Sequence, residues 1–262
     1  MFLSKYEPPE KHMENSVNMQ KARNDILSGK NMVLYELVRS RYMWMNQYIK
    51  DTDANIYEIG CGAGVSKKFL ENPNVVLTDV LDNPWIDRYL DAMKLDMEDG
   101  SVDVFICCNV IHHFASPYQF FKEAERKLRK GGRIILFEPY TSLIMRMAQK
   151  ILRLEGWNEY SDVFSPDEIC NIEGEPWSAN ESIPKLLFRD KEKFEHVFTG
   201  LKLVKYELTE CLLFLCSGGV NFKCWHPNFS GGGCKRLKAV DRFLVTVCPE
   251  VFALGCRIVV KK

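Results

Sequence analysis

Three glycines on alternate positions follow an acidic residue in the segment Asn55-Ile-Tyr-Glu-Ile-Gly-Cys-Gly-Ala-Gly64. The apolar residues around Glu58 predict a buried strand, and residues 65–70 predict the first turns of a helix. A strand, a glycine turn and a helix N-terminus expose backbone N–H groups and let a ligand approach the main chain closely. A dinucleotide site would need a glycine at position 65, where Val65 stands. The segment therefore indicates a site for a nucleotide-like ligand of another kind.

A second apolar stretch, Val75–Asp79, predicts a strand that ends in an acid. Asn72-Pro73 ends the predicted helix before this strand. An acid at the end of the second strand of an α/β sheet can accept hydrogen bonds from both hydroxyls of a ribose. A turn or helix-cap residue is an equally good interpretation of Asp79 taken alone.

The passage from Asp91-Ala92 through Asp99-Gly-Ser to the apolar strand before His112-His113 is the most specific in the chain. Together with the glycine segment and Asp79, it resembles the class I S-adenosylmethionine-dependent methyltransferases. The resemblance implies an α/β, Rossmann-like fold with a seven-stranded, mostly parallel sheet and helices on both faces. It also implies an N-terminal helical cap and an insertion after the fifth strand.

By this resemblance, the cofactor is S-adenosylmethionine. Glu58 would order the glycine loop and reach the methionine ammonium, Asp79 would bind the ribose, and Asp91 with the Ala92 N–H would bind the adenine. Asn109 would lie where the fourth strand opens onto the cofactor. The implied cofactor-binding residues are Glu58, Gly60, Cys61, Gly62, Gly64, Asp79, Asp91, Ala92 and Asn109.

Methyl transfer from a sulfonium requires alignment of the acceptor with the methyl group and, for an alcohol acceptor, removal of a proton. Candidate bases are His112, His113, Glu138 and Tyr140, which all follow the carboxyl ends of predicted strands, where α/β sheets place their sites. The pKa of histidine suits this task. Structural hydrogen bonding by the histidine pair, and support of a neighbouring group by Glu138, are the competing interpretations.

Shorter motifs resemble the type 11 branch, and more narrowly bacterial methyltransferases met among surface-polysaccharide genes. These are His-His-Phe114, Phe-Phe-x-Glu-Ala124, Glu138-Pro and Ser217-Gly-Gly. We therefore expect methyl transfer to a small-molecule or glycan-precursor acceptor, with oxygen favoured. A non-catalytic cofactor-binding scaffold of the same fold is the alternative, and a nicotinamide oxidoreductase is a more distant one.

The chain order predicts four parts. These are an arm and cap helix (1–50, with the helix at 31–49), a cofactor-binding core (51–140), a helical and loop insertion that shapes the substrate site (141–200), and C-terminal strands with a helix (201–262). In the core, Ser116-Pro117 predicts a helix start, Gly131-Gly132 predicts its end, and residues 133–139 predict the fifth strand. Later segments predict helices at 141–154 and 235–247 and strands at 201–216 and 253–260.

Composition narrows the partners and the compartment. The net charge is zero over 262 residues, which gives no general attraction for nucleic acid. Several of the ten cysteines lie inside apolar runs, and no signal peptide is visible. These features indicate free thiols and a cytoplasmic protein, and no apolar run is long enough for a membrane span.

We expect no metal site, because the set Cys216, Cys224, His226 and Cys234 lacks zinc spacing. The run Ser230-Gly-Gly-Gly-Cys-Lys-Arg236 predicts a flexible loop. Oligomeric state has no signal in the sequence.

Overall fold

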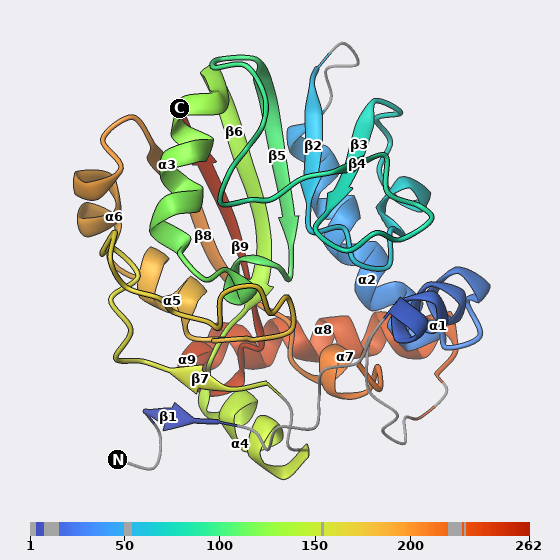
Figure 1. Ribbon diagram of the computed structural model, residues 1–262. Coiled ribbons are helices and arrows are strands. Elements are labelled where there is room, and N and C mark those ends of the chain that lie inside the picture. Colours follow the sequence, from blue (N-terminus) through green and yellow to red (C-terminus); the bar gives the residue numbers. More distant parts are fainter. Residues whose placement is uncertain (1–3, 8–15, 50–53, 153–154, 220–226, 228) are drawn as a thin grey trace.

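A seven-stranded sheet with the strand order β4-β3-β2-β5-β6-β9-β8 organises the protein, as the computed structural model shows (Figure 1). The structure describes residues 4–7, 16–49, 54–152, 155–219, 227 and 229–262. The first five strands in this order are parallel, and β9 is antiparallel to both β6 and β8. The predicted Rossmann-like α/β fold is therefore confirmed. The strands are β2 (Ile56–Ile59), β3 (Val75–Asp79), β4 (Arg88–Tyr89), β5 (Val102–Cys108), β6 (Leu128–Pro139), β8 (Lys202–Thr209) and β9 (Gly255–Lys261).

The central strands are apolar at nearly every position because both faces of the sheet are covered. Along β5, Phe105 and Cys107 belong to one buried cluster, whereas Val104 and Ile106 belong to another on the opposite face. The first cluster holds α3 (Pro117–Lys127), α5 (Ile183–Phe188) and α6 (Lys191–Val197), and the second holds α1 (Ser16–Ser28) and α2 (Met32–Met45). The helices therefore lie on both faces, as predicted.

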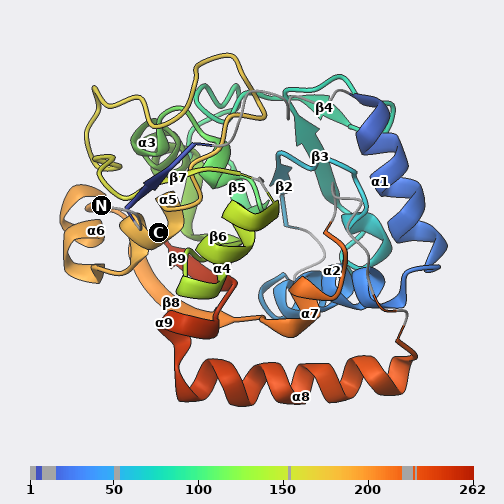
Figure 2. The same ribbon diagram turned by 90° about the horizontal axis from the view of Figure 1, so that it is seen from below.

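The carboxyl ends of the parallel strands point toward a layer of helices (Figures 1 and 2). This layer contains α1, α4 (Leu143–Leu152), α7 (Leu212–Leu215), α8 (Gly231–Val247) and α9 (Pro249–Phe252). A small two-stranded sheet joins β1 (Lys5–Tyr6) to β7 (Trp157–Asn158). The chain after β6, which contains α4 and β7, thus crosses the edge of the sheet where α/β proteins bind their ligands.

Helix α3 begins as its sequence predicts, with Ser116 as N-cap accepting a hydrogen bond from the Gln119 N–H at 3.2 Å. Its predicted end is wrong. The helix stops at Lys127, because Leu128 already has an extended backbone and pairs with Val102 of β5. Gly131-Gly132 therefore lies inside β6.

The predicted helix after the glycine turn is also wrong. Residues 60–74 contain only a single 3₁₀ turn, Ser66–Lys68. The Ser66 hydroxyl is buried and bonded to the Glu58 carboxylate, and Asn72-Pro73 follows before a second α-helical turn can form. The ligand-facing loop therefore lacks a helix dipole of its own.

The glycine run 231–233 was predicted to be a loop, but it forms the first turn of α8. Ser230 is the N-cap and accepts a hydrogen bond from the Gly233 N–H at 3.4 Å. A good N-cap compensates for the low helix propensity of three glycines at a helix start. The predicted strand 201–216 ends at Thr209, and α7 occupies its last part.

Candidate functional site

A cavity of about 710 Å³ opens at the carboxyl ends of β2, β3 and β5, within the size range of small-molecule sites. It brings together most of the residues that the sequence predicts for the site. Those on its wall are Gly60, Cys61, Gly62, Asp79, Asp91, Ala92, Asn109, His112 and His113. Glu58, Gly64, Glu138 and Tyr140 lie outside the cavity wall. The Tyr140 hydroxyl points to α9, where it donates to Glu250 Oε1 at 2.6 Å.

The glycine loop needs its glycines for two physical reasons. Gly60, Gly62 and Gly64 all have positive φ, at 62°, 50° and 60°. A Cβ on Gly60 would lie 2.2 Å from Val110 Cγ2, and one on Gly64 would lie 2.1 Å from Trp85 Cδ1. The loop is therefore packed tightly against Val110 and Trp85. Gly60 and Gly62 also line the cavity.

Several groups hold this loop in place. Asp79 Oδ2 accepts from the Gly62 N–H at 2.8 Å, and Trp85 Nε1 donates to the Gly62 carbonyl at 2.8 Å. Arg23 of α1 donates to the Ala63 carbonyl at 2.8 Å and lies over the Trp85 ring at 5.0 Å. Helix α1 thus contacts the loop through Arg23, a contact that sequence patterns did not predict.

Glu58 supports the loop from behind. Its buried carboxylate accepts from the Tyr42 hydroxyl at 2.8 Å and from Ser66. Burial raises the pKa of Glu58 to about 7, although both hydrogen bonds act in the opposite direction. These contacts link α2, β2 and the 3₁₀ turn around one carboxyl group.

The two predicted acids on the cavity wall differ in environment. Asp79 is buried, and burial raises its pKa despite the N–H groups of Leu81 and Gly62 that bond it. Asp91 is exposed, and its Oδ1 accepts from the Met93 N–H at 2.8 Å. A carboxylate has about four acceptor sites, so each retains capacity for a ligand. The loop, Asp79 and Asp91-Ala92 on one wall fit a nucleoside-containing cofactor.

Glu138 lies under the histidine pair, fully buried at the end of β6. Its Oε1 accepts from the backbone N–H groups of Val110 and Ile111 at 2.9 and 3.1 Å, and its Oε2 lies 2.7 Å from His112 Nδ1. The two histidines belong to the 3₁₀ turn Ile111–His113. Glu138 therefore holds both the backbone and one ring of this turn.

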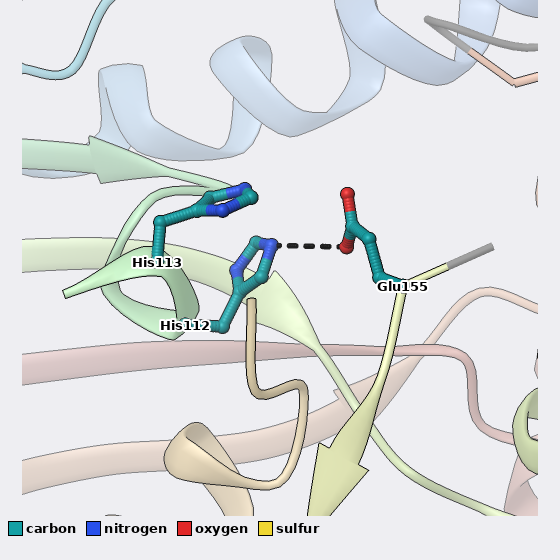
Figure 3. Close-up of side chains that lie close together, drawn as sticks. All are labelled: His112, His113 and Glu155. Atoms are coloured by element: carbon teal, nitrogen blue, oxygen red, sulfur yellow. Dashed lines mark ion pairs between the residues drawn. The ribbon is translucent and has the colours of Figure 1, made fainter. Parts of the chain in front are cut away.

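His112 lies between two carboxylates. Its Nε2 is 3.3 Å from Glu155 Oε2 (Figure 3), and its Nδ1 contacts Glu138. Burial alone would lower the pKa of His112, but the bonds to Glu138 and Glu155 outweigh burial and raise it to about 10. Burial would raise the pKa of Glu155, but the hydrogen bond to His112 and the charge of that ring lower it below its usual range.

His113 has the opposite character. Its Nδ1 lies 3.0 Å from the Ser178 carbonyl oxygen, and its ring centroid is 4.1 Å from that of His112. Burial, and then the charge of His112, lower the pKa of His113 to about 4. His113 is therefore neutral, and Nδ1 carries its proton because a carbonyl can only accept.

Asn109 sits where β5 ends, with the left-handed φ of 55°. Its N–H donates to the Phe137 carbonyl at 2.7 Å, and its side chain faces the cavity. Asparagine tolerates this conformation better than most residues. The turn lets the chain leave the sheet toward the histidine pair.

Three cavity groups were missed by sequence reasoning. Arg41 of α2 is buried and pairs with Glu210 through two bonds of 3.0 and 2.7 Å. Glu155 and Glu181 reach the cavity from the segment after β6. Charged residues in an apolar helix or an irregular segment carry no sequence signal of burial, because their partners are distant in the chain.

Residues 57–136 match a family model described as a methyltransferase domain. The 27-O-demethylrifamycin SV methyltransferase of Amycolatopsis mediterranei is 35% identical over 77 residues, which cover 29% of this chain and 28% of that protein. The mitochondrial ubiquinone biosynthesis O-methyltransferase of Schizosaccharomyces pombe is 22% identical over 184 residues, which cover 58% of this chain and 67% of that one. The chain spans 4%, 14% and 28% of the length of three curated relatives.

A SAM-dependent methyltransferase from Archaeoglobus fulgidus has a similar fold, with a TM-score of 0.50 and 16% identity over 87% of this chain and 94% of that one. The matched residues 57–136 contain the glycine loop, both wall acids and the histidine pair. Residues 57–136 thus match a methyltransferase domain, and the fold of the chain is similar to that of a SAM-dependent methyltransferase.

Proposed function

We propose that the protein transfers a methyl group from S-adenosylmethionine to an oxygen atom of a small-molecule or glycan-linked acceptor. One observation carries this proposal. A single cavity joins the glycine loop and Asp79 to a group of two imidazoles and a carboxylate, His112, His113 and Glu155. The cofactor end and a polar acceptor end therefore share one cavity, as a direct transfer requires.

The residues at the cofactor end have separate tasks. Bound S-adenosylmethionine supplies a methyl group on a positively charged sulfur that leaves readily. The backbone of Gly60, Cys61 and Gly62 holds the methionine end, and Glu58 orders this loop from behind. Asp79 accepts from the ribose hydroxyls, and Asp91 and the Ala92 N–H hold the adenine. Asn109 borders the cofactor where β5 ends.

At the acceptor end, His112 and His113 face the cavity, whereas Glu138 does not. We assign Glu138 the role of a positioning residue, because its oxygens are engaged by the turn N–H groups and by His112. The acceptor hydroxyl binds beside the two imidazoles, which orient it toward the methyl group. Its proton passes to water as the new carbon–oxygen bond forms.

We propose that the segment 141–200 shapes the substrate site and determines which acceptor binds. It contributes Met145, Ile169, Ile172 and Trp177 to the cavity, so the acceptor side has an apolar wall beside the polar group. The fission-yeast relative is named as an O-methyltransferase, which supports oxygen as the acceptor atom. An acceptor with a hydroxyl on a partly apolar body fits these walls.

We also propose a reducing compartment, the cytoplasm, for this chain. Each of the nine cysteines within the described ranges is a free thiol. Among the described helices, none has the length and apolar character needed to cross a membrane. The net charge of zero gives no support for a nucleic-acid substrate.

A two-step experiment tests the proposal. Thermal unfolding is first measured with and without S-adenosylhomocysteine, which should raise the melting temperature because it binds only the folded chain. A panel of alcohols, including nucleotide sugars, is then screened for acceptor-dependent formation of S-adenosylhomocysteine from the cofactor. A cofactor-binding scaffold would show the thermal shift and no turnover with any acceptor. Absence of the shift at saturating ligand would refute the cofactor assignment.

A further inference from the structure

We propose that His112, His113 and Glu155 bind a divalent transition-metal cation, with Zn²⁺ as the preferred ion. The three side chains offer ligand atoms that all lie within 4.8 Å of one another. The two imidazoles come from one turn and point toward Glu155, which approaches from a separate segment (Figure 3). Two imidazoles and one carboxylate form a ligand set of catalytic zinc sites, which keep a fourth position open.

The hydrogen bonds behind the two rings support this assignment. His112 Nδ1 lies 2.7 Å from Glu138 Oε2, and His113 Nδ1 lies 3.0 Å from the Ser178 carbonyl oxygen. When Nδ1 donates its proton to such an acceptor, the lone pair of the ring is on Nε2. Metal-binding histidines are usually fixed in this way by a carboxylate or carbonyl behind them. Here both rings have such a partner.

An ion pair between His112 and Glu155 would explain the 3.3 Å contact between them, but it would use only one imidazole. It would not explain a second ring whose ligand atom lies within the same group. The carboxylates in contact with His112 also favour a cation. Glu138 Oε2 lies 2.7 Å from its Nδ1, and Glu155 Oε2 lies 3.3 Å from its Nε2.

The nature of the ligands selects the ion. Imidazole nitrogen suits zinc and other late first-row cations, whereas Mg²⁺ and Ca²⁺ prefer sites made only of oxygen. This cluster is separate from the cysteine set considered above, in which Cys224 and His226 lie outside the described residues. The new site therefore uses no thiol.

The role of the cation in methyl transfer rests on the proposed function, although cation binding itself does not. A hydroxyl bound at the open position would have a lower pKa, as metal-bound water does. The acceptor oxygen forms a bond to the methyl carbon, and the carbon–sulfur bond breaks with its electron pair left on sulfur. The hydroxyl proton passes to water. The products are the methyl ether, S-adenosylhomocysteine and one proton.

Cation binding is tested on the full chain after chelation and gel filtration. Zinc is titrated by calorimetry, and Co²⁺ is added separately to record its absorption spectrum. We expect one ion per chain and a cobalt spectrum without thiolate charge transfer. Glu155→Gln and His113→Ala should each weaken zinc binding by at least about tenfold, since even substitutions behind a metal ligand cost 10–100-fold. Both variants should still bind S-adenosylhomocysteine, which shows that they are folded.

Two matched controls separate this site from other ligands. Glu173→Gln changes an exposed carboxylate on the same cavity and should leave zinc affinity unchanged. Cys216→Ser with Cys234→Ser removes two thiols and should leave the stoichiometry at one. Unchanged affinity in both Glu155→Gln and His113→Ala, or loss of the ion in the cysteine variant, would overturn the site.

Turnover distinguishes the two proposals. If zinc binds as described and no alcohol is methylated, the proposed function fails and the site stands. If methylation proceeds at the same rate in the chelated protein, the site stands and its role in the transfer is refuted. Loss of turnover on chelation, restored by zinc, supports both.

Discussion

Glu138 Oε2 lies 2.7 Å from His112 Nδ1, while the other oxygen of Glu138 accepts two backbone N–H groups of the turn that carries His112. One buried carboxylate at the end of β6 therefore fixes both the position of the turn and the orientation of an imidazole. The histidine pair on the cavity wall therefore depends on a residue that does not line the cavity.

Replacing Glu138 with glutamine tests this positioning role. The amide keeps an oxygen for the N–H groups but removes the charge that orients His112. We expect kcat to fall about 10–100-fold, the range seen for groups behind a catalytic ligand, with little change in the KM for the cofactor. Steady-state kinetics with calorimetry of S-adenosylhomocysteine measure both. An unchanged kcat would contradict the assignment. A KM for the cofactor that changes as much as kcat would also contradict it.

Asp79 is predicted to carry the ribose end of the cofactor. Asp79→Ala should weaken binding of S-adenosylhomocysteine by about 1–3 kcal/mol, because a charged hydrogen-bond acceptor is lost. The exposed Asp82, which follows in the next turn and does not line the cavity, serves as the control. Calorimetry on both variants decides the matter. Equal affinities of the Asp79 and Asp82 variants would refute the ribose role.

Gly64 and Gly100 form a matched pair for the glycine loop. Both have positive φ, 60° and 68°, but an added Cβ meets Trp85 only at Gly64, and nothing lies within 4 Å at Gly100. Gly100→Ala should therefore cost only the backbone strain, about 1–2 kcal/mol. Gly64→Ala should cost more, because the Trp85 indole must move. Urea denaturation measures the free energy of unfolding of both variants. Equal losses of stability would show that the loop and Trp85 accommodate the added methyl group without cost.

Glu58 predicts a pH dependence of stability. Its pKa is raised from 4.5 to about 7 in the folded chain. Between these values the native state holds a proton that the unfolded state has lost, so the free energy of unfolding falls as pH rises. The full contribution is present below pH 4.5 and is lost by about pH 7, an effect of about 3 kcal/mol.

The measurement is the difference in unfolding free energy between wild type and Glu58→Gln at several pH values from 4.5 to 7.5. The glutamine cannot titrate, so the wild type should lose stability relative to the variant as pH rises. A constant difference across this window would show that Glu58 has an ordinary pKa.

The Arg41–Glu210 pair predicts strong coupling. Both side chains are almost fully buried, at 4% and 6% exposure, and two hydrogen bonds join them. Arg41→Met should destabilise by about 3–5 kcal/mol, because Glu210 keeps an unpaired buried charge. Adding Glu210→Leu should restore much of this loss. Additive losses in the double-mutant cycle would mean that the pair is not coupled.

The central strands were predictable because local apolar runs and turn residues carry them. Residues 75–79, the apolar run before His112-His113 and residues 133–139 predict strands, and the family resemblance implied a seven-stranded, mostly parallel sheet. The helix expected after Gly64 failed for a non-local reason. Ser66 turns inward to reach Glu58, and this contact is invisible in helix periodicity.

The candidate site was predictable where residues are neighbours in the chain, as in the glycine loop and the pair Asp91-Ala92. It was not predictable where distant segments meet. Glu155 contacts His112 from 43 positions away, in a segment without periodicity. The sequence therefore predicted the histidine pair but not the carboxylate that faces it. Arg23 contacts the glycine loop from an arm whose polar sequence gave no sign of a binding role.

Transfer of an isotopically labelled methyl group tests the central claim most directly. The protein is incubated with methyl-labelled S-adenosylmethionine and an alcohol from the acceptor screen, and the products are separated and their label located by mass spectrometry and NMR. We predict label on the acceptor oxygen in equal amount to the S-adenosylhomocysteine formed, and a much slower reaction with Glu138→Gln. Tight cofactor binding with no label in any acceptor would contradict the account.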